Sequence, residues 1–172
     1  MKRKIKTDLI KTETTIKKMN DYRKWLLALL ITATACVNLN VYEKYEAIPG
    51  TKWPNNKIFR FEYLSTDTVS SKNVEINLRH NDFYKYNNIY LFVTTIAPDG
   101  KNLKDTVEFT LANAEGKWVG SGVGNIYDLR MFYKHNIRFG QEGKYIFYIQ
   151  HGMRETVLKD ITDIGIRIEN AK

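Results

Sequence analysis

The sequence predicts an all-β fold, an antiparallel β-sandwich or jelly roll in a single domain that follows an N-terminal signal segment. Short segments in which apolar and polar residues alternate recur at fairly even spacing through the second half of the chain. Turn residues separate these segments, and helical periodicity is nearly absent there. Seven or eight short strands of this kind favour a sandwich, with a closed barrel as the second candidate.

The chain opens with a basic leader that ends in an apolar run. This run, residues 25–35, follows a cluster of basic residues and ends in Ala-Thr-Ala directly before Cys36, the single cysteine of the chain. A basic region, a short apolar region and small residues are the parts of a secretory signal peptide, and the final cysteine makes it a bacterial lipoprotein signal helix. We expect a diacylglyceryl group on the Cys36 thiol, cleavage between Ala35 and Cys36, and acylation of the new amine.

Other roles for residues 25–35 are less consistent with the pattern. A transmembrane helix must cross about 30 Å of hydrocarbon, and this run spans only roughly 16 Å. A buried core helix is a second alternative, but an all-apolar helix directly after a basic run is unusual in a globular domain. Met19 offers a second start site, which would make residues 1–18 untranslated or a dispensable extension. Nothing in the sequence favours the remaining alternative, an N-terminal regulatory arm.

The positive charge of the chain is concentrated in the leader. The net charge is +8 over 172 residues. Residues 1–35 hold nine Lys or Arg and three Asp or Glu and so carry +6, which leaves +2 for the mature chain. We therefore expect no binding to nucleic acid. Because the cysteine is committed to lipid, no intramolecular disulfide can form and the fold depends on packing.

After the cysteine we expect a lead segment, residues 36–56, and a β-sandwich domain, residues 57–172. The lead contains two prolines and a glycine and has no clear period. Part of it should lie against the domain, because Tyr45 and Trp53 are too apolar for a free tether. The expected strands of the domain span residues 58–64, 74–79, 89–96, 106–111, 117–122, 144–151 and 161–169.

Three connections between these strands are predicted by composition. Residues 97–102 contain Pro-Asp-Gly and should close a hairpin between 89–96 and 106–111. Residues 113–116 form a second turn, and residues 154–158 are a polar connection. Residues 125–133 break the alternation and predict a short helical turn or an irregular crossing.

Motifs for catalysis or metal binding are missing from the sequence. His80, His135 and His151 are not spaced as metal ligands, so we expect no metal and no cofactor. His80 and His151 are interpreted as hydrogen-bonding residues at a loop and a strand end. The segment Gly120–Gly124 lies in an expected strand rather than before a helix, so it predicts a bend, a bulge or close backbone approach. We predict no enzymatic activity and no small-molecule substrate, since a glycoside hydrolase would need two carboxylates about 5–10 Å apart in one cleft.

Aromatic residues gather in residues 82–88, outside the expected strands. Tyr84 and Tyr86 would share a face if this segment is extended. Tyrosine beside Asn and Asp can stack on a sugar ring or anchor a protein interface, and it can equally pack a core. A lipid-anchored glycan-binding module is therefore the alternative function.

Several blocks of the mature chain form a specific series along the sequence. The most specific are Asn77-Leu-Arg with the following Asp-Phe-Tyr, Gln150-His-Gly-Met-Arg, and Asp163-Ile-Gly-Ile-Arg-Ile-Glu. The complete set is Cys36 and residues 42–45, 53, 77–79, 82–88, 98–100, 104–106, 143–145, 150–154 and 161–169. In this order the blocks resemble the gliding-motility lipoprotein GldH family of the Bacteroidetes. The chain departs from the family in its long extension before Met19 and in its short connection 153–159.

The resemblance implies an envelope lipoprotein needed for gliding, which works beside the motor and the type IX secretion machinery. It implies no catalytic residue, and Cys36 is the functional residue that transfers, on its motif. A partner surface is expected at Arg79, Asp82, Tyr84, Tyr86, Gln150, His151 and Arg154. The alternative is that Arg79 pairs with Asp82 and the others brace the sheet ends.

The expected location is the outer membrane, facing the periplasm. Val37 rather than Asp follows the cysteine, and no acidic run comes after it. By analogy with lipoprotein sorting, the first feature favours the outer membrane and the second argues against exposure on the cell surface. The expected partners are the membrane, through the lipid on Cys36, and other gliding or envelope proteins.

Overall fold

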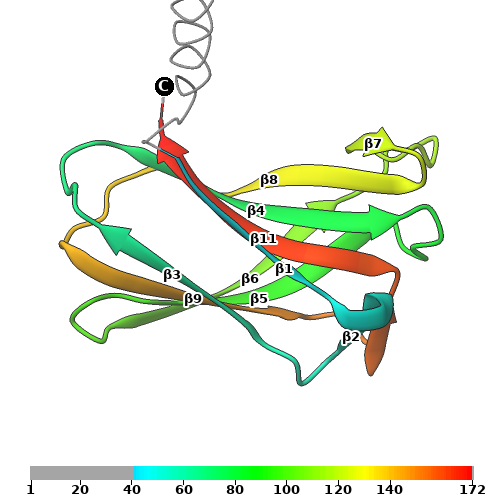
Figure 1. Cartoon of the computed structure of the whole chain (residues 1–172), viewed down its shortest axis with the longest axis horizontal. Coiled ribbons are helices and arrows are strands. Elements are labelled where there is room, and N and C mark those ends of the chain that lie inside the picture. Colours follow the sequence, from blue (N-terminus) through cyan, green and yellow to red (C-terminus); the bar gives the residue numbers. More distant parts are fainter. Residues whose placement is uncertain (1–40, 172) are drawn as a thin grey trace, which may run out of the picture. The chain divides into compact units, whose positions relative to one another are not determined.

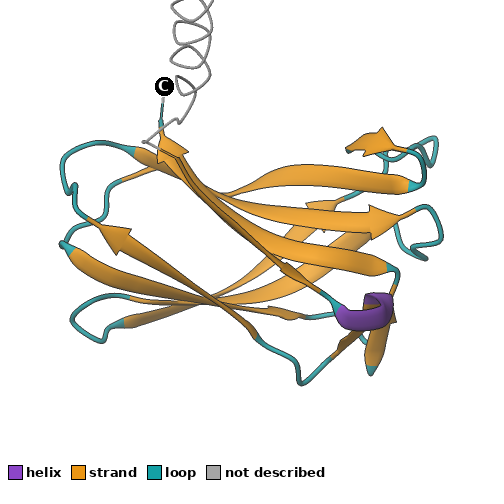
Figure 2. Ribbon diagram, in the orientation of Figure 1, coloured by secondary structure: helices purple, strands orange, loops and turns teal. Residues whose placement is uncertain are grey.

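The computed structural model describes residues 41–171, which form two antiparallel β-sheets packed face to face (Figures 1 and 2). The predicted sandwich is confirmed. The signal segment and Cys36 lie outside the described residues, and the first strand begins five residues after Cys36. One turn of 3₁₀ helix, η1 (Pro49–Thr51), is the sole helical element of residues 41–171.

The larger sheet contains a strand formed by the lead segment. Its order is β1 (Val41–Ala47), β11 (Ile161–Asn170), β4 (Lys72–Asn81), β8 (Ile126–Ile137) and β7 (Ser121–Val123). β1 pairs with β11 from Val41 opposite Glu169 to Ala47 opposite Asp163. Part of the lead therefore lies against the domain, as expected, and does so as an edge strand. The chain thus enters the sandwich beside its own C-terminal strand (Figure 1).

The smaller sheet contains the predicted hairpin. Its order is β3 (Phe59–Ser65), β9 (Gly143–His151), β5 (Asn88–Ile96) and β6 (Asn102–Thr110). β5 and β6 pair through their whole length, and the Gly100 amide donates to the Ala97 carbonyl oxygen at 2.9 Å to close the turn. Gly100 has φ of 82°, which glycine adopts without steric cost. Two further short strands, β2 (Lys52–Pro54) and β10 (Val157–Lys159), pair with each other.

The prediction for residues 125–133 is wrong. Instead of a helical turn or an irregular crossing, residues 126–133 lie in β8 (Ile126–Ile137), which has 12 residues and is the longest strand of the sandwich. Leu129, Met131 and Tyr133 point inward in strict alternation, but the exposed Phe132 between them disguises the period. Residues 117–122 were also expected to form one strand, and they form an isolated bridge at Trp118 followed by β7.

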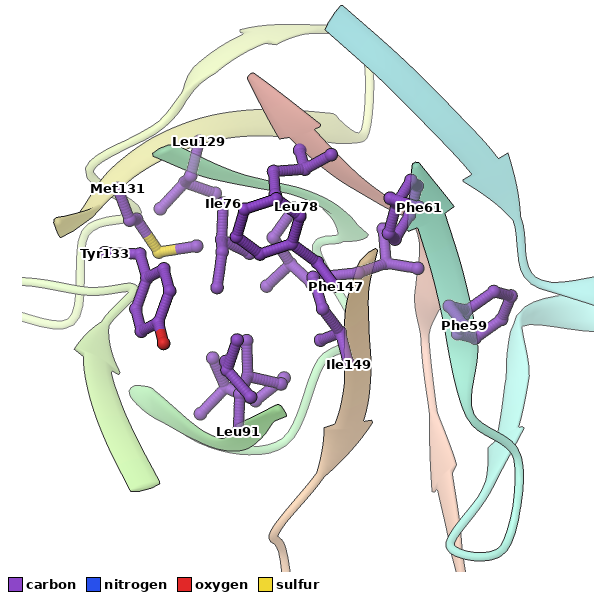
Figure 3. Packing of buried hydrophobic residues seen from close by; sticks show 14 of the residues in the cluster. Phe59, Phe61, Ile76, Leu78, Leu91, Leu129, Met131, Tyr133, Phe147 and Ile149 are labelled. Atoms are coloured by element: carbon purple, nitrogen blue, oxygen red, sulfur yellow. The ribbon is translucent and has the colours of Figure 1, made fainter. Parts of the chain in front are cut away.

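Side chains from both sheets meet in one hydrophobic core (Figure 3). From the larger sheet, Ile76 and Leu78 of β4 lie opposite Ile166 and Ile164 of β11, and all four are fully buried. From the smaller sheet, the buried aromatic and aliphatic side chains are those of Phe61, Leu91, Phe147 and Ile149. Each fully buried side chain of this size contributes roughly 1.5–3 kcal/mol, so packing alone can hold the sandwich.

β4 is buried on its outer face as well as its inner face. Its outward side chains Asn73, Glu75 and Asn77 are only 7, 7 and 0% exposed. A carboxylate and amides at such depth require partners. Their hydrogen-bond and ion-pair partners come from the neighbouring strands. These contacts lie on the same face of the sheet as Arg79, one of the site residues that the sequence predicts.

Candidate functional site

Arg79 lies on the outer face of the larger sheet and pairs with Asp128, which stands opposite it on β8. Its Nε donates to Asp128 Oδ2 at 2.9 Å, and this hydrogen bond raises the pKa of the guanidinium. The guanidinium also lies 4.2 Å from the ring centroid of Tyr45, whose hydroxyl donates to the other oxygen of Asp128. The structure therefore places Arg79 in an ion pair, but with Asp128 rather than with Asp82.

A glycine makes this arrangement possible. Gly165 stands directly opposite Tyr45 across β1 and β11. A Cβ atom at Gly165 would lie 2.8 Å from the Lys44 carbonyl oxygen and 3.0 Å from the Tyr45 ring. Glycine lets the ring lie flat over the sheet, where it stacks against Arg79.

Next to Arg79, a charge cluster crosses the same face of the sheet. We define the charge cluster by its members, Glu43, Glu75, Asn77, Arg130, Arg167 and Glu169. Glu43 accepts a hydrogen bond from Asn77 at 2.7 Å and from Arg167 at 3.1 Å. Arg167 also lies 3.4 Å from Glu75, and burial raises the pKa of that carboxyl, with Glu169 adding to the rise. The charge cluster joins three strands through one central guanidinium, so its first role is structural.

Residues 82–87 form a loop between β4 and β5 rather than an extended strand. The Phe83 amide donates to Asn81 Oδ1 at 2.9 Å, which is the turn that asparagine favours. The turn exposes Asp82 and Phe83 and turns Tyr84 inward, where it is 4% exposed. The Tyr84 hydroxyl donates to the Asn88 carbonyl oxygen, and burial raises its pKa. Because Tyr84 is buried, it cannot share a sugar-stacking face with the half-buried Tyr86.

Tyr86 joins this loop to the connection between β9 and β10. Its hydroxyl donates to Glu155, which raises the pKa of the tyrosine. A pocket of about 250 Å³ lies between the two loops, with Phe83, Tyr86, Glu155 and Val157 in its lining. The sequence singled out Tyr86 but not Phe83, Glu155 or Val157 as site residues. Phe83, 73% exposed, was visible only as part of an aromatic cluster, and no local signal marks the others.

The remaining predicted residues separate into buried and exposed groups. His151 is 2% exposed and packs edge-on against Trp53. Gln150 donates from Nε2 to the Asn55 carbonyl oxygen, which holds β9 to the segment after β2. Arg154 is exposed on the loop that also carries Glu155. Asp82, Tyr86 and Arg154 are therefore the members of the predicted surface that lie on the two loops and reach solvent.

Two buried histidines should make the stability of the sandwich depend on pH. Burial lowers the pKa of His80, which is enclosed by Tyr84, Trp118 and Tyr127, and the pKa of His151. The unfolded chain then binds more protons below the ordinary histidine pKa of about 6.5, so stability falls as pH drops below that value. We expect the slope to reach at most about 1.4 kcal/mol per pH unit for each histidine.

Thermal unfolding between pH 7.5 and 5.5 measures this effect. His80→Gln should flatten the profile, because it removes one of the two buried rings that must take up a proton on unfolding. A midpoint that stays constant across this range in the unmodified chain would contradict the expectation.

The glycine-rich segment 120–124 behaves as the sequence suggested. A Cβ at Gly120 would lie 2.8 Å from the Asp128 carbonyl oxygen, and one at Gly122 would lie 3.0 Å from the Ile126 carbonyl oxygen. Gly124 has φ of 67° at the turn from β7 to β8. The segment therefore allows close backbone approach, as predicted.

Residues 41–171 contain neither a cluster of metal ligands nor a membrane-spanning helix. No three His, Cys, Asp or Glu side chains of residues 41–171 are grouped so that they could hold a metal ion. In the same residues, no helix has the length and apolar character needed to cross a membrane.

The family of this chain follows from a match to a family model. The family model described as GldH lipoprotein matches residues 40–168. The chain belongs to the GldH lipoprotein family. The match reaches every strand of the sandwich and ends two residues before the end of β11, so the folded domain itself carries the family relationship.

Two curated relatives of the GldH family cover most of the chain. The gliding motility lipoprotein GldH homolog of Christiangramia forsetii is 33% identical over 149 residues, which are 83% of this chain and 91% of the relative. The gliding motility lipoprotein GldH of Flavobacterium johnsoniae is 32% identical over 151 residues, 84% of this chain and 93% of the relative. Among solved structures, a non-crystalline cellulose specific carbohydrate-binding module has a TM-score of 0.40 at 10% identity, over 76% of this chain and 72% of its own.

Proposed function

We propose that this chain is a lipid-tethered, non-catalytic component of the gliding machinery. In this proposal it is acylated at Cys36, held in the outer membrane facing the periplasm, and assembled with other envelope proteins beside the type IX secretion apparatus. The observation that carries the proposal is the family match over residues 40–168, with relatives named gliding motility lipoproteins. The signal that ends at Cys36 lies immediately before this match.

The tether would keep the sandwich close to the membrane. β1 begins at Val41, so five peptide steps separate the acylated cysteine from the first strand. A chain of this length spans at most about 18 Å. Each buried methylene contributes about 0.8 kcal/mol, and attachment becomes firm when two or more acyl chains are present. A triacylated Cys36 would thus hold the domain at the bilayer surface permanently.

A non-catalytic role is supported by the hydrogen bonds of two carboxylates that line the pocket between the two loops. Glu155 accepts a hydrogen bond from the Tyr86 hydroxyl, and Asp160 accepts one from Asn81 Nδ2 at 3.0 Å. Glu155 thus links the two loops, and Asp160 links the turn between β10 and β11 to the end of β4. Their arrangement favours a rigid end of the sandwich over an acid–base pair.

We propose that the partner surface is formed by the two loops at this end, and we call it the loop surface. Its exposed members are Asp82, Phe83 and Arg154, together with the half-buried Tyr86, while the buried Tyr84 and His151 brace the loops from beneath. A few residues contribute most of the binding energy of a protein interface. An exposed phenylalanine beside a pocket with charged neighbours is typical of such residues. Phe83 is therefore the residue whose loss should weaken assembly most.

A crosslinked capture from membranes tests this proposal. With Phe83→Asp in the full chain, the amount of crosslinked envelope partners that is captured should fall at least about tenfold, because a charge replaces an apolar anchor. Phe132→Asp is the matched control, since Phe132 is also exposed, at 55%, but lies on β8 away from the loop surface. Partners that mass spectrometry identifies as gliding or secretion components would support the assembly role. Equal capture by both variants would refute the loop surface.

A further inference from the structure

A second pocket, of about 400 Å³, opens between the two sheets at the end where β8 connects to β9. Its deep wall includes Val74, Phe139 and Phe147, which are 1, 3 and 2% exposed and belong to the hydrophobic core. Its volume lies within the range of about 300–1,000 Å³ that is usual for small-molecule sites. The pocket therefore gives an apolar ligand access to core side chains without opening the sandwich.

The charged residues that line this pocket are both cations. Lys134 Nζ lies 2.9 Å from Asp105 Oδ2, so the charge of Lys134 is balanced, and Asp105 also accepts a hydrogen bond from the Tyr133 hydroxyl. Arg138 is exposed, and within residues 41–171 no carboxylate lies within ion-pair distance of it. The pocket thus combines an apolar interior with net positive charge at its mouth, which complements a ligand that has an apolar body and an anionic head.

The position of the pocket relates it to the membrane. Val41 pairs with Glu169, Glu169 with Asn73, and the neighbouring Lys72 pairs with Ile137, which lines the pocket. Three strand spacings of about 4.8 Å therefore separate the start of β1 from the pocket, or roughly 14 Å. In Figure 1, the connection from β8 to β9 and the C-terminal end of β11, beside which β1 starts, lie at the same end of the sandwich. The pocket is at the end of the domain that the tether would bring nearest to the bilayer.

We propose that this pocket binds one acyl chain of an anionic phospholipid, with the headgroup phosphate beside Arg138 and Lys134. The proposal rests on the tether at Cys36, which places the pocket at the membrane surface. Arginine forms strong, charge-assisted hydrogen bonds with phosphate, and the apolar wall removes the acyl chain from water. Occupation of the pocket would orient the sandwich on the membrane, because it adds a second point of attachment to the acyl chains on Cys36.

Photolabelling of the lipidated full chain tests the proposal. The protein is reconstituted in phosphatidylethanolamine vesicles that contain a trace of phosphatidylglycerol with a diazirine on one acyl chain, and labelled peptides are mapped after irradiation. We expect label on the peptides that carry Leu103, Phe139 and Phe147, and less label when the diazirine is carried by phosphatidylethanolamine. The anionic headgroup is then the feature that recruits the lipid.

Matched variants separate the pocket from general contact with the bilayer. Leu103→Trp should fill the mouth and reduce the pocket label about tenfold, whereas Leu64→Trp should not, because Leu64 is exposed on β3 outside the pocket. Arg138→Glu should also reduce it, and Arg154→Glu, at an exposed arginine of the loop surface, should have no effect.

The labelling experiment distinguishes failure of the tether from failure of the pocket. If the protein does not sediment with the vesicles, the proposed attachment at Cys36 is wrong. If it sediments but Leu103→Trp and Leu64→Trp label equally, or label appears only outside the pocket, the lipid site is overturned.

Discussion

Replacement of Arg167 by methionine is expected to lower the free energy of unfolding by about 3 kcal/mol. The guanidinium contacts Glu43, Glu75 and Glu169, and the Glu75 side chain is only 9% exposed. Methionine keeps much of the volume but removes the positive charge, so Glu75 is left buried without its cation. Denaturant unfolding at pH 7.5 measures the loss.

The charge itself can be separated from packing by two further variants. Glu75→Gln combined with Arg167→Met should recover part of the lost stability, because no buried carboxylate then remains beside the missing cation. Arg154→Met is the control for removal of an exposed arginine and should change the free energy of unfolding by less than about 0.5 kcal/mol. A loss below this level for Arg167→Met would show that the charge cluster does not stabilise the sheet.

Substitution of Cys36 by serine is expected to abolish lipid attachment altogether. Serine lacks the thiol that accepts the diacylglyceryl group, so the precursor should stay uncleaved, take up no palmitate and leave cells without gliding. Thr34→Ser is the matched control, because it keeps a small residue in the signal and leaves the cysteine in place. Palmitate labelling and membrane fractionation measure the effect. Lipid uptake by Cys36→Ser at the level of the control would contradict the assignment.

The strands could be predicted from the sequence wherever apolar residues alternate against a polar face. Val74, Ile76 and Leu78 all point to the core as the alternation predicts. The same rule fails in β8, because Phe132 is exposed between two inward residues and removes the contrast on which the pattern depends. A single apolar residue on the solvent face is common in proteins and is enough to hide a strand.

Contacts between distant positions could not be predicted in this way. Arg79 and Asp82 are near in sequence, yet a β4 residue faces its neighbour on the adjacent strand, and that residue is Asp128. Glu43 and Arg167 lie 124 positions apart and meet because β1 pairs with β11. The register of neighbouring strands decides which charged residues stand opposite one another, and a single sequence does not show that register.

The local sequence pattern also could not predict which aromatic residues are buried. Tyr84 and the exposed Phe83 are adjacent and similar in size, but the turn set by Asn81 sends one to the core and the other to solvent. The sequence identified the cluster and left open whether it packs or binds. The structure shows that it does the first at Tyr84 and leaves Phe83 available for the second.

We propose above all that one acylated cysteine holds the β-sandwich at the envelope, and the mass of the N-terminal peptide of the native protein tests this most directly. We expect the protein extracted from membranes to begin at Cys36 and to carry the mass of a diacylglyceryl group and an N-acyl chain. A native protein that begins at Met1 or Met19, carries no acyl mass and stays in the aqueous phase would contradict it.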